Sequence, residues 1–124
     1  MKQVLATEQA PAAIGPYSQC IAAGETVYVS GQLPLDPATG AFPEGIAAQT
    51  AQSLKNIQAI LAQQGMTLAN VVKTTVFLAD INDFAEMNKV YGEFFTQPYP
   101  ARSAVQVAKL PKDAPLEIEC IAVK

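Results

Sequence analysis

The distribution of apolar and polar residues along the chain predicts several β-strands. Residues 17–22 (YSQCIA) and 27–31 (VYVSG) are rich in β-branched and aromatic residues, and the short segment 23–26 between them predicts a hairpin. Residues 71–78 (VVKTTVFL) predict a third strand. Residues 103–107 and 116–123 predict two more, separated by a proline-containing connection.

Helical periodicity appears in two segments between these strands. From Ile46 to Gln64 apolar residues recur at steps of three and four, and Gly65 stands where a glycine commonly ends a helix. The segment 33–45 before this helix is rich in proline and glycine, so we expect a structured loop that lines a pocket.

The second helix is predicted from residue 83 onward. Asp83 and Glu86 have the spacing of a capping box. The residues that follow place one apolar stripe on the helix, which we interpret as core packing: Phe84, Met87, Tyr91 and Phe94. The order of elements is then ββαβαββ, an α+β fold, and we expect residues 1–124 to form one domain.

The last predicted strand carries apolar residues on both of its faces. Alternation places Leu116 and Ile118 on one face, and Ile121 and Val123 on the other. Two helices cannot cover both faces of such a sheet, so we expect both helices on one face and other copies of the chain on the second. The sequence therefore predicts a homo-oligomer.

Charge and composition exclude several classes of function. The net charge is −3, and the seven lysines are scattered, so there is no electrostatic footprint for nucleic acid. Histidine is absent, which removes the usual zinc ligands and histidine-dependent catalysis. We expect neither a metal nor a cofactor.

The cysteines and the N-terminus indicate where the protein resides. Cys20 and Cys120 are a hundred positions apart without metal-binding spacing, and we expect buried, reduced thiols without a function. No continuous apolar segment of signal-peptide or membrane-spanning length is present. We therefore expect a cytoplasmic protein that is not bound to a membrane.

Arg102 is the strongest candidate for a binding residue. It is the only arginine of the chain, and its planar guanidinium suits bidentate recognition of a carboxylate better than a lysine does. A structural role, in which Arg102 fastens a loop or pairs with a glutamate, is the alternative. If strand 103–107 paired with strand 116–123, Glu117 would approach the same pocket as Arg102. For Glu119, which shares the face of Glu117, a place in the same site and a solvent-exposed position at the strand end are equally expected.

Six segments, in this order, resemble the RidA family, also called YjgF or L-PSP: GPYSQ (15–19), VSGQ (29–32), VKTTVF (72–77), PARS (100–103), VAKLP (107–111) and EIE (117–119). The resemblance implies a chorismate-mutase-like fold with two helices on one face, assembled as a homotrimer with clefts between subunits. The implied activity is hydrolysis of reactive 2-imino acids, such as 2-iminobutanoate and 2-iminopropanoate, to 2-oxo acids and ammonia, without a cofactor.

The resemblance also implies roles for particular residues. Arg102 is similar to the arginine that binds the substrate carboxylate, and Glu117 to the glutamate that holds the attacking water. Tyr17, Ser30 and Gly31 are similar to residues that shape the cleft, although Tyr17 is equally expected as an aromatic plug at a subunit boundary.

One position departs from the family pattern, because Ala104 stands where many members have a cysteine. A catalytic thiol is excluded there, but the backbone N–H of Ala104 is expected to bind a substrate oxygen. Two other functions remain open: a trimer that binds 2-oxo acids without turnover, and an endoribonuclease or translation inhibitor, which the charge distribution disfavours.

Overall fold

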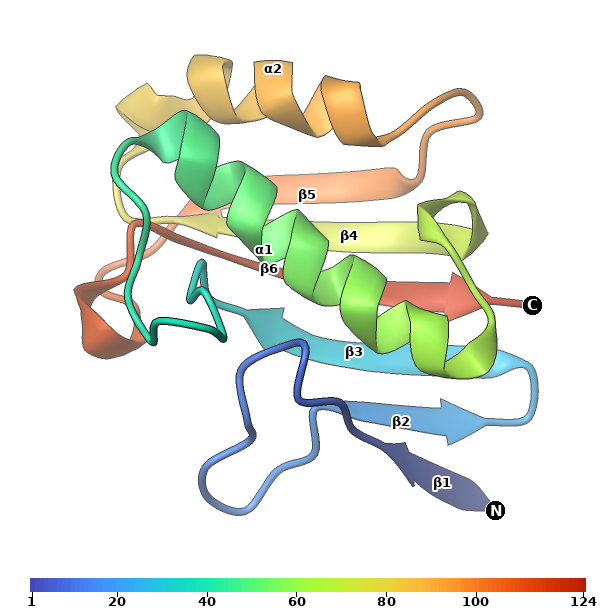
Figure 1. Cartoon of the computed structure of the whole chain (residues 1–124). Coiled ribbons are helices and arrows are strands. Elements are labelled where there is room, and N and C mark those ends of the chain that lie inside the picture. Colours follow the sequence, from blue (N-terminus) through green and yellow to red (C-terminus); the bar gives the residue numbers. More distant parts are fainter.

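A computed structural model describes residues 1–124 as a six-stranded sheet with two helices on one face (Figure 1). The strands are β1 (Lys2–Leu5), β2 (Cys20–Ala23), β3 (Thr26–Gln32), β4 (Val71–Leu78), β5 (Ala101–Gln106) and β6 (Leu116–Val123). The helices are α1 (Ile46–Leu61) and α2 (Phe84–Phe94). The predicted α+β class and the placement of both helices on one face are confirmed.

The strands follow the spatial order β1-β2-β3-β6-β4-β5. All neighbouring pairs are antiparallel except β4 and β5, which are parallel. A parallel pair needs a long crossover connection, and α2 forms it. As a result, β5 lies at the edge beyond β4, and it is not paired with β6.

The helix face of the sheet holds the hydrophobic core. Every second residue of β6, from Leu116 through Ala122, is buried beneath the helices. On the helix side, α1 contributes four fully buried apolar side chains: Leu54, Ile57, Ile60 and Leu61. A short 3₁₀ turn continues α1, and Gly65, at φ 67°, ends it in the left-handed conformation that glycine adopts without strain.

The other face of the sheet carries no helix and is partly apolar. One cross-strand row on this face joins Val4, Ile21, Tyr28 and Ile121. Val4 and Tyr28 in this row are 60% and 49% exposed. The predicted alternation of β6 is confirmed, since Glu117, Glu119, Ile121 and Val123 all lie on this open face.

The structure corrects four details of the predicted elements. The N-terminal strand β1 was not predicted, and β2 begins at Cys20, so that Tyr17 lies in the preceding loop. Asp83 makes no capping hydrogen bond; instead Asp80 accepts one from the backbone N–H of Asn82, which starts a 3₁₀ turn ahead of α2. The expected pairing of 103–107 with 116–123 is wrong, because β4 lies between these strands.

Both cysteines are buried and free, as predicted. Cys20 on β2 and Cys120 on β6 are both register partners of Val29 on β3, so β3 lies between the two cysteines. Burial raises the pKa of Cys20 to about 11 and that of Cys120 to about 12. Such thiols stay protonated and unreactive near neutral pH. No helix of the chain combines the length and the apolar character that crossing a membrane would take.

Candidate active site

Glu117 lies on the open face of the sheet, where β3 and β6 meet. The regular pairing of these two strands is interrupted between Val29 and Gln32, and Gly31 sits inside this irregularity. A Cβ atom on Gly31 would lie 2.6 Å from Cδ of Glu117 and 2.7 Å from its Oε1. Glycine at position 31 therefore makes the space that the Glu117 carboxyl group occupies.

The surroundings of Glu117 favour its neutral form. Burial raises the pKa of the Glu117 carboxyl above its usual value, and the nearby charge of Glu119 raises the pKa further, to a smaller extent. No lysine or arginine forms an ion pair with it in the chain. A half-buried carboxyl with a raised pKa can accept and return a proton closer to neutral pH than an ordinary glutamate can.

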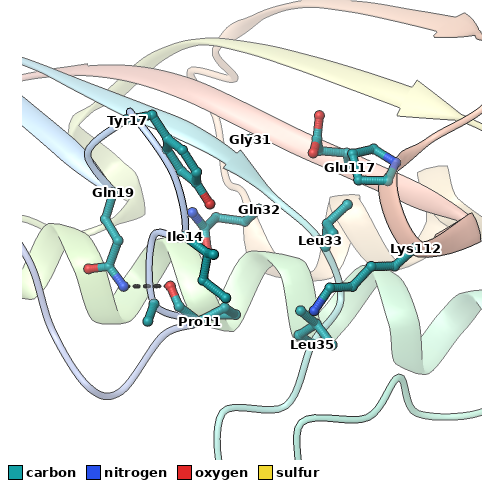
Figure 2. A pocket seen from close by; sticks show the side chains of 12 residues that line it. Pro11, Ile14, Tyr17, Gln19, Gly31, Gln32, Leu33, Leu35, Lys112 and Glu117 are labelled. Atoms are coloured by element: carbon teal, nitrogen blue, oxygen red, sulfur yellow. Dashed lines mark hydrogen bonds between the residues drawn. The ribbon is translucent and has the colours of Figure 1, made fainter.

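A pocket of about 410 Å³ opens beside Glu117 (Figure 2). Tyr17 stands on one side of it and Glu117 on the other, with Gly31 between them. The apolar walls come from the N-terminal segment and the loop after β3: Pro11, Ala12, Ile14, Leu33 and Leu35. The predicted role of the 33–45 loop in lining a pocket is therefore confirmed.

Two buried amides hold these walls in place. Gln19 accepts a hydrogen bond from the backbone N–H of Thr7 at 2.8 Å and donates one to the carbonyl of Pro11 at 2.6 Å. Asn56 of α1 donates to the carbonyls of Leu33 and Leu35 at 3.2 and 2.9 Å. Both walls are thus tied to the sheet or to the helix beneath it, which favours a preformed pocket.

Arg102 lies in a second pocket, on the helix face of β5. Its register partner on β4 is Thr74, which is fully buried under the helices. This pocket of about 460 Å³ is lined by residues of α2 and of the connection to β5: Asn88, Tyr91, Gly92, Tyr99, Pro100 and Arg102 itself.

Three side chains fix the orientation of the Arg102 guanidinium. Its Nη1 donates a hydrogen bond of 2.7 Å to Oδ1 of Asn88. Its Cζ lies 4.7 Å from the centre of the Tyr91 ring and 5.4 Å from that of Phe84, both within cation–π range. The hydroxyl of Tyr91 is in turn hydrogen-bonded to that of Thr74 at 2.7 Å. With one of its N–H groups engaged, the guanidinium retains free donors for a ligand carboxylate.

Arg102 and Glu117 do not share a pocket within one chain, because the strand pairing that would have brought them together is absent. Arg102 is on the helix face of the sheet and Glu117 on the open face, with β4 between their strands. Each pocket therefore contains only one of the two residues.

The remaining candidate residues are divided among other places. Tyr17 and Gly31 line the pocket of Glu117. Ser30 lines a neighbouring hollow with Tyr17, and its hydroxyl donates to the carbonyl of Ser18 at 2.6 Å. Ala104 packs its methyl group against the hydrophobic core and lines neither pocket.

Comparison with known proteins decides the family. The family model described as Endoribonuclease L-PSP matches residues 7–124. The chain belongs to the L-PSP family. The predicted resemblance to RidA is confirmed, and a crystal structure of RidA from an Antarctic Psychrobacter aligns over 98% of this chain at 49% identity, with a TM-score of 0.95.

Curated relatives in this L-PSP family match the chain over its whole length. A RutC family protein of Haemophilus influenzae is 54% identical, with 100% of this chain and 98% of the relative covered. The 2-iminobutanoate/2-iminopropanoate deaminase of Salmonella typhimurium is 53% identical, with 100% and 99% covered. The crystal structure of Escherichia coli TdcF with bound serine aligns with a TM-score of 0.94 at 47% identity, over 98% of each chain.

The structure of this L-PSP family member adds residues that were not predicted. Asn88, Tyr91 and Thr74 surround or support Arg102, and Lys112 lines the pocket of Glu117. Tyr91 was assigned to the core stripe of the second helix, and it is indeed buried, but one face of its ring meets the guanidinium. The chain contains no cluster of three or more histidine, cysteine or acidic residues that could hold a metal ion.

Proposed function

We propose that this chain is a deaminase that hydrolyses 2-imino acids, such as 2-iminobutanoate and 2-iminopropanoate, to 2-oxo acids and ammonia. The site is formed between neighbouring copies of a homotrimer, with Arg102 from one copy and Glu117 from the next. Residues 1–124 act as one domain, in the cytoplasm. The name of full-length relatives at 51–53% identity supports this activity.

One observation carries the proposal: Arg102 and Glu117 form two incomplete sites on opposite faces of the sheet. Arg102 has free donors for a carboxylate, but its pocket contains no carboxyl group that could act as a base. Glu117 has a raised pKa and an adjoining pocket but no partner cation. Bringing the β5 edge of one copy against the open face of another joins a carboxylate clamp to a proton-transfer group.

The open face supports such an assembly. Its row from Val4 to Ile121 is apolar, and Val105 of β5, which faces the same side, is 44% exposed. Exposed apolar sheet surface is stabilised by burial against a second molecule, at roughly 25 cal/mol for each Å² removed from water. A closed ring of three copies buries this surface in every copy and leaves none free for further association.

The proposed mechanism needs only water as a co-reactant. The Arg102 guanidinium binds the substrate carboxylate through two parallel hydrogen bonds and so fixes the position of the imine carbon. The imine nitrogen enters the reaction protonated. Ionised Glu117 accepts a proton from a water molecule as the water oxygen bonds to the imine carbon, and the electron pair of the C=N double bond moves onto the nitrogen. The resulting carbinolamine has the former imine nitrogen as an amine.

Collapse of this intermediate completes the reaction. Glu117 returns the proton to the nitrogen, and the C–N bond breaks with its electron pair leaving on nitrogen as ammonia. The hydroxyl oxygen becomes the carbonyl of the 2-oxo acid as it gives up its proton to Glu117, which is ionised again and releases the proton to solvent. General acid–base help of this kind contributes on the order of 10²–10⁴-fold. The raised pKa of Glu117 suits both directions of transfer.

The other candidate residues have supporting roles in this proposal. Tyr17 covers the substrate side chain at the mouth of the pocket, and Gly31 leaves room for Glu117. Ser30 holds the Tyr17 loop through its hydrogen bond to Ser18. The backbone N–H of Ala104 is proposed to bind a substrate oxygen beside Arg102.

The test is the release of ammonia from 2-iminobutanoate generated in situ by a threonine dehydratase. We expect the wild type to accelerate release above the uncatalysed background and Arg102→Ala to lose the acceleration. Binding of 2-oxobutanoate by the wild type without any acceleration would refute the deaminase and leave a 2-oxo acid-binding protein.

A further inference from the structure

The pocket beside Glu117 is larger than the proposed four-carbon substrate requires. Its volume is about 410 Å³. We assign each non-hydrogen atom ~30 Å³, the volume that one molecule occupies in liquid water. On this basis 2-iminobutanoate would fill about half of the pocket. The remaining space has a defined lining, so it can select among longer side chains.

That lining is mainly apolar and contains a single cation. Ile14, Leu33 and Leu35 form apolar wall, and Lys112 is the one lysine or arginine among the lining residues. Figure 2 shows the side-chain nitrogen of Lys112 beside Leu35, and the carboxyl group of Glu117 on the side near Gly31. The two charged groups therefore lie at different ends of the pocket.

The backbone conformation at Lys112 is unusual. Lys112 and Asp113 follow each other with φ angles of 58° and 53°, in the left-handed region that residues with a Cβ seldom adopt. This turn ends two residues before β6, and Lys112 lines the pocket of Glu117. Such conformations cluster at active sites and ligand-binding positions, where the surrounding structure enforces them.

The ammonium group of Lys112 is not used inside the chain. The one ion pair of the chain joins Nζ of the nearby Lys109 to Oδ1 of Asp113 at 3.1 Å, which leaves Lys112 without a carboxylate within 4.0 Å. It makes no side-chain hydrogen bond either, although it lines a concave surface. An unpaired ammonium above an apolar wall is suited to the anionic end of a ligand whose stem lies along that wall.

We infer that Lys112 is a specificity-determining residue that binds a carboxylate at the far end of the substrate side chain. This inference rests on the proposed function and extends its substrate class to 2-imino acids with a terminal carboxylate. The reacting end of such a substrate lies at Glu117, its methylene groups lie against Leu33 and Leu35, and its terminal carboxylate meets Lys112.

The test compares two 2-oxo acids of equal chain length by calorimetry. 2-Oxoadipate carries a terminal carboxylate where 2-oxohexanoate has a methyl group, and 2-oxobutanoate serves as the short reference ligand. We expect the wild type to bind 2-oxoadipate about three- to tenfold more tightly than 2-oxohexanoate, with a smaller preference at high salt.

Variants assign the preference to Lys112. Lys112→Met should abolish the preference for 2-oxoadipate and weaken 2-oxobutanoate binding much less than 2-oxoadipate binding, while Lys112→Arg should keep the preference. The control is Lys55→Met, which removes an exposed charge on α1 and should change nothing. Equal affinity of the wild type for both six-carbon acids, or a preference that survives in Lys112→Met, would overturn the inference.

The reference ligand separates this inference from the proposed function. If 2-oxobutanoate binds and the preference is missing, only the role of Lys112 is refuted. If none of the three 2-oxo acids binds, both the role of Lys112 and the proposed site are refuted.

Discussion

Gly31→Ala tests whether the placement of the Glu117 carboxyl group is what the site depends on. The new Cβ atom would lie 2.6 Å from Cδ, 2.7 Å from Oε1 and 2.9 Å from Cγ of Glu117. Non-bonded carbon atoms prefer separations of about 3.5–4.0 Å, so the carboxyl group must move by about 1 Å. Gly31 is not among the glycines with positive φ, so the backbone itself accepts alanine.

The expected loss of stability is small and the expected loss of turnover is large, so the experiment can tell the two effects apart. The displaced side chain can leave its preferred rotamer at a cost of roughly 0.5–1.5 kcal/mol in the free energy of unfolding. A displacement of about 1 Å in a catalytic group can lower turnover by up to about 10²-fold. We therefore expect a folded protein whose kcat falls about 10- to 100-fold while its affinity for 2-oxobutanoate changes less.

A double-mutant cycle isolates the clash. Glu117→Ala deletes all three of the atoms that the new methyl group would meet, so Gly31→Ala should cost no stability in that background. Chemical denaturation of the four proteins measures the coupling, and the imine hydrolysis assay measures kcat. Equal losses of stability in both backgrounds, or an unchanged kcat in Gly31→Ala alone, would refute the reasoning.

Four further predictions follow from the two pockets. Arg102→Lys should lose most of its activity in the imine assay although the charge remains, because an ammonium group cannot form two parallel hydrogen bonds to a carboxylate; near-normal turnover would contradict the clamp. Glu117→Gln should keep 2-oxobutanoate binding in calorimetry but slow turnover, whereas unchanged turnover would assign proton transfer to another group. Glu119→Gln removes a charge that raises the Glu117 pKa. Turnover falls at acid pH as Glu117 becomes protonated, and this fall should therefore move to lower pH in the variant. If the acid limb of the rate profile does not move, Glu117 does not control it. Tyr91→Leu removes the ring under Arg102 and should weaken 2-oxobutanoate binding about 3- to 30-fold, while Tyr91→Phe keeps the ring and should bind nearly normally; equal losses in both would assign the effect to the Thr74 hydrogen bond.

Local sequence patterns were enough to predict the elements whose residues are buried at regular intervals along the chain. The strands 71–78 and 116–123 and the helix that Gly65 ends were predicted because burial on one face leaves a repeat in the sequence. The strand β1 was missed because it has only four residues, three of them exposed, and thus no repeat to read.

The pairing of strands was beyond local patterns. Strand 103–107 was expected beside 116–123, its neighbour in the sequence, but the crossover through α2 places β5 beyond β4. Which strands pair depends on how the helices pack on the sheet, and periodicity does not record it.

The candidate site was predictable only in part, for the same reason. The single arginine marked Arg102, and the resemblance to the RidA family marked Glu117, Gly31 and Tyr17. Their distribution over two faces of the sheet required the strand order. Asn88 and Lys112 left no signal, because an isolated polar residue on a helix and a lysine in a turn are both ordinary surface features.

The central claim is that one site takes Arg102 and Glu117 from different copies of the chain, and mixing inactive variants tests it most directly. Arg102→Ala and Glu117→Ala are unfolded together and refolded at equal concentrations, and the hydrolysis of 2-iminobutanoate is measured. In a randomly mixed cyclic trimer, about one quarter of the sites combine an intact Arg102 with an intact Glu117. We predict recovery of about one quarter of the wild-type activity. A mixture that forms hybrid oligomers yet stays as inactive as either variant alone would contradict the shared site.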